Sequence, residues 1–233
     1  MENKTNPLII PLSIIIAGGL VALSIYFGGK NTQNVAVQPT TTNKANIVTG
    51  QVEPVTASDN IVGDINAKVV VVEYSDYECP FCKSFHKTMQ QVMATYKPSE
   101  VAWVYRQFPI VQLHSRAPKE SEAAFCVNEL GGNKAFWQFT NRVFEVTTSN
   151  NTLDPKELPN IATFSGVDAT AFNTCLSSGK YTSAVQNAVA AATKAGAQGT
   201  PYSVVLTKSG KKSSINGAEP FEQVKNTIDS LLK

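Results

Sequence analysis

The sequence predicts an α/β fold in which a block of helices is inserted between two groups of strands. A β-branched run at 68–75 is typical of a buried strand. Apolar residues with helical spacing then occupy much of 118–195, between strands predicted at 101–107 and 202–207. The chain ends in an amphipathic helix. The element order is therefore β-α-β, helices, β-β-α, which is an α/β layout and not a helical bundle.

The first helix is predicted to begin at Pro80, directly after the first strand. Proline is favoured at the first helical position, which makes Cys79 the N-cap residue. Lys97-Pro98 closes the helix, and residues 101–107 form the second strand. The apolar face of this helix consists of Phe81, Phe85, Met89, Val92 and Tyr96.

The helical insert is predicted to cover about 115–196. Two strands follow around a turn at Ser209-Gly210. The last helix carries apolar residues on one face, and we expect that face to cover the sheet. The helices of the insert are expected at 118–130, 134–146, 155–164, 169–176 and 182–195, and the two strands at 202–207 and 212–216.

Residues 8–27 contain no charged side chain and are numerous enough to cross a membrane as a helix. A cleaved signal peptide is the alternative, but no clean small-residue cleavage site follows. The sequence therefore predicts a short flank at 1–7, an uncleaved transmembrane anchor at 8–27 and an exported C-terminal part. Residues 28–57 are predicted to be a flexible linker, and 58–233 to be the folded domain.

The charge balance does not indicate a nucleic-acid partner. The 233 residues include 20 Lys and Arg against 18 Asp and Glu, a net charge of +2. Proteins that bind nucleic acid usually carry a clustered basic excess. We therefore expect that this protein does not bind nucleic acid.

The stretch VVVVEYSDYECPFCK, residues 69–83, places a carboxylate in a strand and then two cysteines in Cys-x-x-Cys spacing. An N-capping cysteine lies at the positive end of the helix dipole, beside unpaired N–H groups, and both stabilise a thiolate. Cys79 is therefore the predicted nucleophile and the more exposed thiol. Cys82, one turn further in, is the predicted resolving thiol, which closes the disulfide.

Metal and haem sites fit this pair poorly. A zinc site would need further ligands, but the chain has only 4 cysteines and 2 histidines, without close spacing. Haem attachment needs a histidine directly after Cys82, where Lys83 stands. Neither a metal nor a cofactor is therefore expected. A structural Cys79–Cys82 bond in a tethered peptide-binding (holdase) module stays open as an alternative.

These residues resemble the DsbA-like thiol:disulfide oxidoreductases, which place a helical domain within a thioredoxin fold. The motif VVEYSDYECPFC, the helical insert and the GTP of 199–201 carry the resemblance, which covers about 60–233. The RQFP of 106–109, and His114 with the Ala-rich stretch after it, narrow it to this subfamily. The resemblance implies a membrane-anchored, extracytoplasmic enzyme of prokaryotic type. It would form disulfides in exported proteins and be reoxidised by a membrane partner of the DsbB or VKOR kind.

The resemblance also assigns roles around the cysteine pair. Glu73, six residues before Cys79, is expected to be a buried carboxylate that exchanges a proton with the resolving thiol; an exposed strand-end acid is the alternative. Pro201 corresponds to the family's cis-proline, which leaves the backbone of Thr200 free to pair with an extended substrate. Glu78 is interpreted as an exposed acid that opposes thiolate formation.

The spacer between the cysteines departs from the family pattern. Strongly oxidising members carry Cys-Pro-His-Cys, and their histidine helps to stabilise the thiolate. Here Pro80 stiffens the turn, but Phe81 can neither donate a hydrogen bond nor carry charge. A disulfide reductase or isomerase of the same fold therefore stays open beside the oxidase.

The other two cysteines, Cys126 and Cys175, fall on two helices of the insert. In an oxidising compartment such a pair is more often bonded than free, and the resemblance implies the same pairing. Two buried, unpaired thiols are the alternative. Four further residues are interpreted as structural: Trp103, Arg106, His114 and Trp137.

Overall fold

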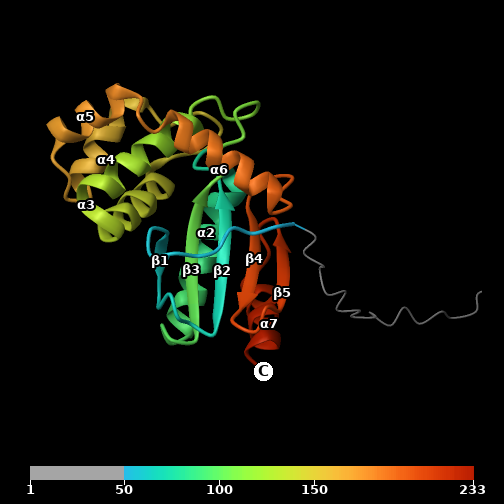
Figure 1. The fold of residues 1–233 in the computed structure, drawn as a ribbon. Helices are drawn as coiled ribbons and strands as arrows, with labels where there is room; N and C mark the ends of the chain where they lie inside the picture. The colour runs from blue at the N-terminus through green and yellow to red at the C-terminus, as the bar shows by residue number, and fades with distance from the viewer. Residues whose placement is uncertain (1–49) are drawn as a thin grey trace, which may run out of the picture. The chain divides into compact units, whose positions relative to one another are not determined.

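A computed structural model describes residues 50–233, built around a five-stranded sheet of order β1-β3-β2-β4-β5 (Figure 1). The two central strands, β2 and β3, run parallel, and the other neighbouring pairs are antiparallel. The predicted fold class is confirmed. The strands are β1 (Asn60–Val62), β2 (Val69–Ser75), β3 (Val101–Gln107), β4 (Tyr202–Thr207) and β5 (Lys212–Asn216).

The predicted elements are present with small shifts at their ends, and two details differ. The edge strand β1 was not predicted, because three residues are too few to show an alternating pattern. The first two predicted helices of the insert share one label, α3 (Ala117–Val146), but the non-helical backbone of Gly132, with φ +69° and ψ −171°, divides α3 between them as predicted. The third begins as a 3-10 turn, η1 (Pro155–Glu157), before α4 (Leu158–Phe164). The others are α2 (Pro80–Thr95), α5 (Ala169–Ser178), α6 (Thr182–Lys194) and α7 (Phe221–Leu232).

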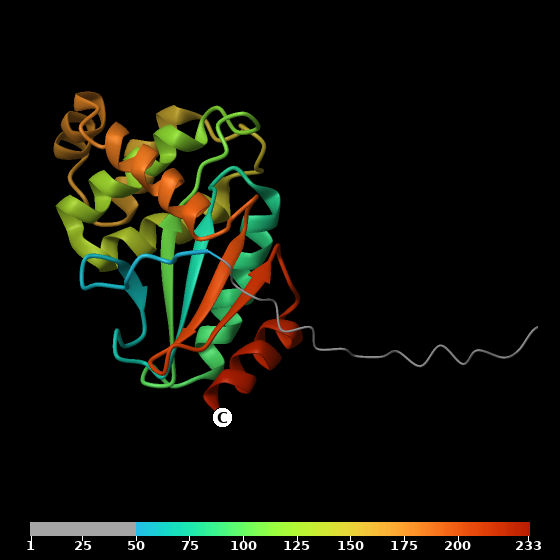
Figure 2. The ribbon, with the colours of Figure 1, turned by 45° about the vertical axis from the view of Figure 1, so that its right-hand side comes forward.

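Alternation along the central strands assigns their side chains to two apolar clusters, one on each face of the sheet. Val71 of β2 and its partner Trp103 belong to the cluster that α2 and α7 share with the insert. Val72 and its partner Val104 belong to the cluster on the opposite face, which alanines at the end of α6 cover. Figure 2 shows α2 and α7 behind the sheet and α6 in front of its upper end. Because Glu73 is two residues beyond Val71, it points toward α2.

The insert is fastened to the sheet by a buried polar chain. Tyr77, in the loop after β2, hydrogen-bonds through its hydroxyl to Thr140 of α3 at 2.8 Å. Gln107 of β3 donates to the Tyr77 hydroxyl at 3.3 Å and accepts from Ser121 of α3 at 3.0 Å. These bonds fix α3 beside the loop that leads to the cysteine pair.

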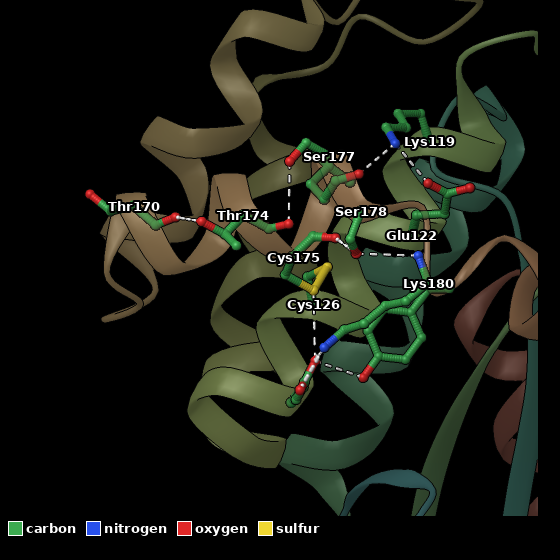
Figure 3. The surroundings of a disulfide bond; sticks show 12 residues. Lys119, Glu122, Cys126, Thr170, Thr174, Cys175, Ser177, Ser178 and Lys180 are labelled. Atoms are coloured by element: carbon green, nitrogen blue, oxygen red, sulfur yellow. Dashed lines mark hydrogen bonds and ion pairs between the residues drawn. A yellow bond between two sulfur atoms is a disulfide. The ribbon is translucent and has the colours of Figure 1, made fainter.

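Cys126 of α3 and Cys175 of α5 form a disulfide with an Sγ–Sγ distance of 2.01 Å (Figure 3). The predicted pairing is therefore present in the structure. Lys119 of α3 also donates to the carbonyl oxygen of Leu176 at 2.8 Å, and Lys180 forms an ion pair with Glu129. Covalent and polar contacts together hold α5 against α3.

The segment at 50–57 is packed on the domain, although the sequence assigned it to the linker. The N–H of Gln51 donates to the carbonyl oxygen of Lys194 at 2.8 Å. The Arg106 guanidinium donates to the carbonyl oxygens of Glu53 and Pro54, both at 3.1 Å. The folded domain therefore begins before the predicted start at Ser58. The sequence alone did not show this, because these contacts join residues that are far apart along the chain. The structural role expected for Arg106 is confirmed.

The predicted flank, the anchor at 8–27 and the linker up to residue 49 lie outside the described residues. Within 50–233, no helix is long and apolar enough to span a membrane.

Candidate active site

The two cysteines of the Cys-x-x-Cys pair lie at the start of α2. Cys79 is the N-cap residue, with φ −79° and ψ 121°, and Pro80 begins the helix, as predicted. Both thiols are free. Cys79 is 4% exposed and Cys82 is 0% exposed, so the predicted difference in exposure has the right direction but is small.

The two thiols differ strongly in acidity. Hydrogen bonding from the Cys82 thiol lowers the pKa of Cys79 to about 6, although burial opposes this; the Thr200 side chain and the backbone N–H groups of Phe81 and Cys82 lower it further. Burial raises the pKa of Cys82, and the neighbouring charges of Cys79 and Glu73 add to this effect. Near neutral pH, the pair therefore holds one thiolate, on Cys79.

The segment before β4 lies against the sulfur of Cys79. The peptide bond between Thr200 and Pro201 is cis, and the Thr200 carbonyl oxygen lies 3.4 Å from the sulfur of Cys79. The cysteine pair and the Gly-Thr-Pro motif, far apart in sequence, are thus brought together.

Glu73 lies beneath the pair and is fully buried, so the expected buried position is confirmed and an exposed strand-end acid is excluded. Burial raises the pKa of Glu73 from 4.5 to about 7, although the hydrogen-bonding groups of Ser75 and Trp103 lower it. The indole N–H of Trp103 donates to Oε2 of Glu73 at 2.8 Å. A carboxyl group with a pKa near 7 can both give and take a proton at neutral pH.

Asp76 connects the resolving thiol to the loop after β3. Its N–H lies 3.4 Å from the sulfur of Cys82 and donates to it. Its carboxylate accepts from the N–H of Ile110 at 2.7 Å and pairs with Nδ1 of His114 at 2.9 Å. His114 thus has the structural role that the sequence indicated, and its partner Asp76 was not predicted.

Glu78 is fully buried, so its interpretation as an exposed acid was wrong. Its carboxylate accepts the N–H groups of Asn151 at 2.6 Å, Thr152 at 3.3 Å and Leu153 at 3.3 Å. Positive φ angles at Ser149, Asn150 and Asn151 turn this loop around the carboxylate. A local sequence pattern gives no sign of this contact, since the loop is more than 70 residues away. Glu78 is the residue directly before Cys79, and its hydrogen bonds therefore connect the loop at 151–153 to the active site.

Glu78→Gln is expected to destabilise the protein by about 2 kcal/mol, because hydrogen bonds to a charged acceptor contribute about 1.5–3 kcal/mol. The amides of residues 151–153 should then exchange hydrogen at least about tenfold faster, and hydrogen-exchange mass spectrometry measures this. Glu122→Gln is the matched control: Glu122 is also nearly buried, but its carboxylate binds Lys119 and Thr182. Equal hydrogen exchange at 151–153 in both variants would contradict the conclusion that the Glu78 carboxylate holds this loop.

Phe81 also differs from its predicted place. It is 64% exposed, whereas Phe85, Met89 and Val92 of the same helical face are buried. The face continues along α2, but its first turn extends past the core. An exposed aromatic ring therefore stands between the two cysteines.

Comparisons with known proteins agree with this architecture. The family model described as thioredoxin matches residues 56–230. The structure of DsbA2 from Pseudomonas aeruginosa superposes with a TM-score of 0.63 at 24% identity, covering 77% of this chain and 97% of that one. The structure of oxidised BdbD from Bacillus subtilis superposes with a TM-score of 0.68 at 21% identity, covering 80% and 99%.

A similar stretch also occurs within much longer proteins. The Na(+)/H(+) antiporter NhaA 3 of Salinispora tropica is 29% identical over 143 residues, which are 61% of this chain. This chain spans only 21% of that protein's length. The match thus concerns one part of the longer chain.

Proposed function

Because this chain belongs to the thioredoxin family and has a DsbA-like fold, we propose that it is a thiol-disulfide oxidoreductase that forms disulfides in exported proteins. The observation that carries the proposal is the unequal acidity of the two thiols, with the pKa of Cys79 near 6 and that of Cys82 raised. A stable Cys79 thiolate favours the reduced form of the pair and is a good leaving group. Both properties favour donation of the disulfide over reduction of substrates.

The reaction begins with the Cys79–Cys82 disulfide. A substrate thiolate attacks Sγ of Cys79, the Cys79–Cys82 bond breaks, and Cys82 leaves as a thiolate that takes a proton from Glu73. The second substrate thiolate then attacks the substrate sulfur of the mixed disulfide, and Cys79 leaves as a stable thiolate. Two electrons pass from the substrate dithiol to the cysteine pair.

The surroundings of Cys79 are suited to an unfolded substrate. We place the extended substrate strand along Thr200 and Pro201, whose segment lies against Cys79. The exposed ring of Phe81 would contact apolar side chains near the substrate cysteine. Pro80 fixes the turn between the two thiols.

We place the domain outside the cytoplasm, anchored by residues 8–27. The Cys126–Cys175 bond supports this location, because structural disulfides persist in oxidising compartments. After each cycle, the reduced pair must pass two electrons to an oxidant. A membrane protein of the DsbB or VKOR kind is the proposed acceptor.

The test uses a reduced, unfolded protein with two cysteines as substrate. The wild-type protein, oxidised at Cys79–Cys82, is expected to convert one equivalent to the disulfide form and to become reduced itself. Two variants that each keep one cysteine of the pair, Cys82→Ala and Cys79→Ala, are first treated with oxidised glutathione, so that the remaining cysteine carries glutathione as a mixed disulfide. With a second form of the substrate that keeps only one cysteine, Cys82→Ala should then be captured as a lasting mixed disulfide through Cys79, because neither protein has a second thiol that could release it. Cys79→Ala should form few such adducts. Non-reducing gels and mass spectrometry measure both.

Two results would contradict the proposal. If both variants formed the same adducts, or neither did, the exchange mechanism would fail and a tethered binding module would be the better interpretation. If the oxidised wild-type protein left the substrate reduced, and the reduced protein opened substrate disulfides, it would be a reductase.

A further inference from the structure

Trp103 is the residue that holds the carboxyl group of Glu73. Its indole Nε1 donates to Oε2 at 2.8 Å, and both side chains are buried. The sequence indicated only a structural role for Trp103. The contact arises because β2 and β3 are parallel and in a register that pairs Val71 with Trp103, which places the indole beside the next inward residue of β2, Glu73.

The two oxygens of Glu73 have different surroundings. Oε2 accepts the indole N–H, whereas Oε1 accepts no hydrogen bond of normal length from the described residues. An indole can only donate, so it must face an oxygen that accepts. In the protonated carboxyl group the carbonyl oxygen is the better acceptor, and the proton is therefore expected on Oε1.

The indole of Trp103 is itself held in place. Its ring centroid lies 4.6 Å from that of Trp137 and 5.0 Å from that of His86. Trp137 presents a buried Nε1 that has no hydrogen-bond partner among residues 50–233, so it donates no hydrogen bond to Glu73. The two tryptophans share one aromatic cluster, but of the two only Trp103 donates a hydrogen bond to the carboxyl group.

We propose that Trp103 is a positioning residue: by binding Oε2 it keeps Oε1 of Glu73 as the oxygen that exchanges a proton with Cys82. The inference rests on the proposed oxidoreductase function. When the pair is reoxidised, an external thiol is bound to Cys79 as a mixed disulfide. The proton of the Cys82 thiol moves to Oε1, the Cys82 thiolate attacks Sγ of Cys79, and the external thiolate leaves.

The titratable groups that face Glu73 are Cys82 of α2, Tyr105 of β3 and, through Cys82, Cys79. Burial raises the pKa values of Cys82 and Tyr105, and it lowers that of His86, which packs on Trp103, to about 4. Cys79 is blocked in the mixed disulfide. A titration of the closing step near pH 7 can therefore be attributed to Glu73.

The test compares Trp103→Phe with Trp137→Phe in the full chain, because each removes one indole from the same cluster. The first measurement is the pH titration of the ¹³C-labelled Glu73 carboxyl group by NMR. The second is the rate at which Cys82 displaces glutathione from Cys79. Loss of the N–H donor disfavours the carboxylate, so in Trp103→Phe the midpoint should rise by about one pH unit.

A midpoint moved from about 7 to about 8 would slow closure at pH 7 about fivefold, because about a tenth instead of half of the carboxyl groups would be ionised. Trp137→Phe should leave the midpoint unchanged. In a Glu73→Gln background, Trp103→Phe should have no further effect on the pH profile. Equal shifts in the two Trp variants, no shift in either, or an effect that persists without Glu73 would each overturn the proposal.

A third measurement uses only the wild-type protein, so it does not depend on whether a variant folds. The indole N–H resonance of Trp103 should titrate with the same midpoint as the Glu73 carboxyl group, and that of Trp137 should not. An indole resonance of Trp103 that is independent of pH would overturn the proposal. These NMR results do not depend on whether the protein oxidises exported substrates, so failure of the proposed function would be recognised separately.

Discussion

Cys126→Ala/Cys175→Ala is expected to lower the free energy of unfolding by about 4 kcal/mol. The disulfide joins residues 49 apart in sequence, and closing a loop of that length restricts the unfolded chain by about this amount. The bond also connects α3 to α5, and α5 buries only Phe172 and Cys175. We therefore expect α5 to separate from the insert before the sheet unfolds. Urea unfolding of the oxidised proteins measures the loss, and hydrogen exchange locates it.

The matched control is Cys79→Ala/Cys82→Ala, which removes the other cysteine pair. Those cysteines are three residues apart, so a bond between them restricts the unfolded chain far less. This variant should retain most of the stability while losing thiol exchange. If the two double variants lost the same free energy, or if removal of the Cys126–Cys175 bond cost less than about 1 kcal/mol, loop closure would not be the source of its contribution.

The parts of the fold that the sequence predicted correctly are those with local signals. Hydrophobic period and turn residues located β2, β3, β4 and β5, and Pro80 located the start of α2. The packing of 50–57 could not be predicted in this way. It depends on Arg106 and the end of α6, which are close to this segment only in the folded chain.

The same distinction applies to the site. Cys79 and Cys82 were identified from their spacing at a strand-to-helix junction, and Pro201 and the buried Glu73 from resemblance. The hydrogen bond from Trp103 was missed, because it depends on the register between two parallel strands. The error at Glu78 has the same origin: a carboxylate next to a reactive thiol looks exposed until the loop that binds it is known.

Glu73→Gln is expected to stabilise the protein above neutral pH. The pKa of Glu73 rises from 4.5 to about 7 on folding, chiefly through burial. Below about pH 4 the carboxyl group is neutral in both states, and the native state bears no penalty. As the pH rises from 4.5 to 7, the unfolded chain releases this proton while the native state keeps it, so stability is lost progressively. Above pH 7 the loss reaches about 3 kcal/mol, at about 1.4 kcal/mol per pKa unit.

The measurement is the free energy of unfolding of both proteins from pH 4 to pH 9, since glutamine removes the titration and leaves a side chain of similar shape. The advantage of Glu73→Gln over wild type should grow by about 3 kcal/mol between pH 4 and pH 8 and then stay constant. Glu120→Gln provides a contrast, because burial and the neighbouring Glu78 raise the pKa of Glu120 to about 10, so its advantage should keep growing beyond pH 8. A difference between Glu73→Gln and wild type that does not change with pH would mean that Glu73 ionises as easily in the folded protein as in the unfolded chain, and a carboxyl group of that kind could not return a proton to Cys82 at neutral pH.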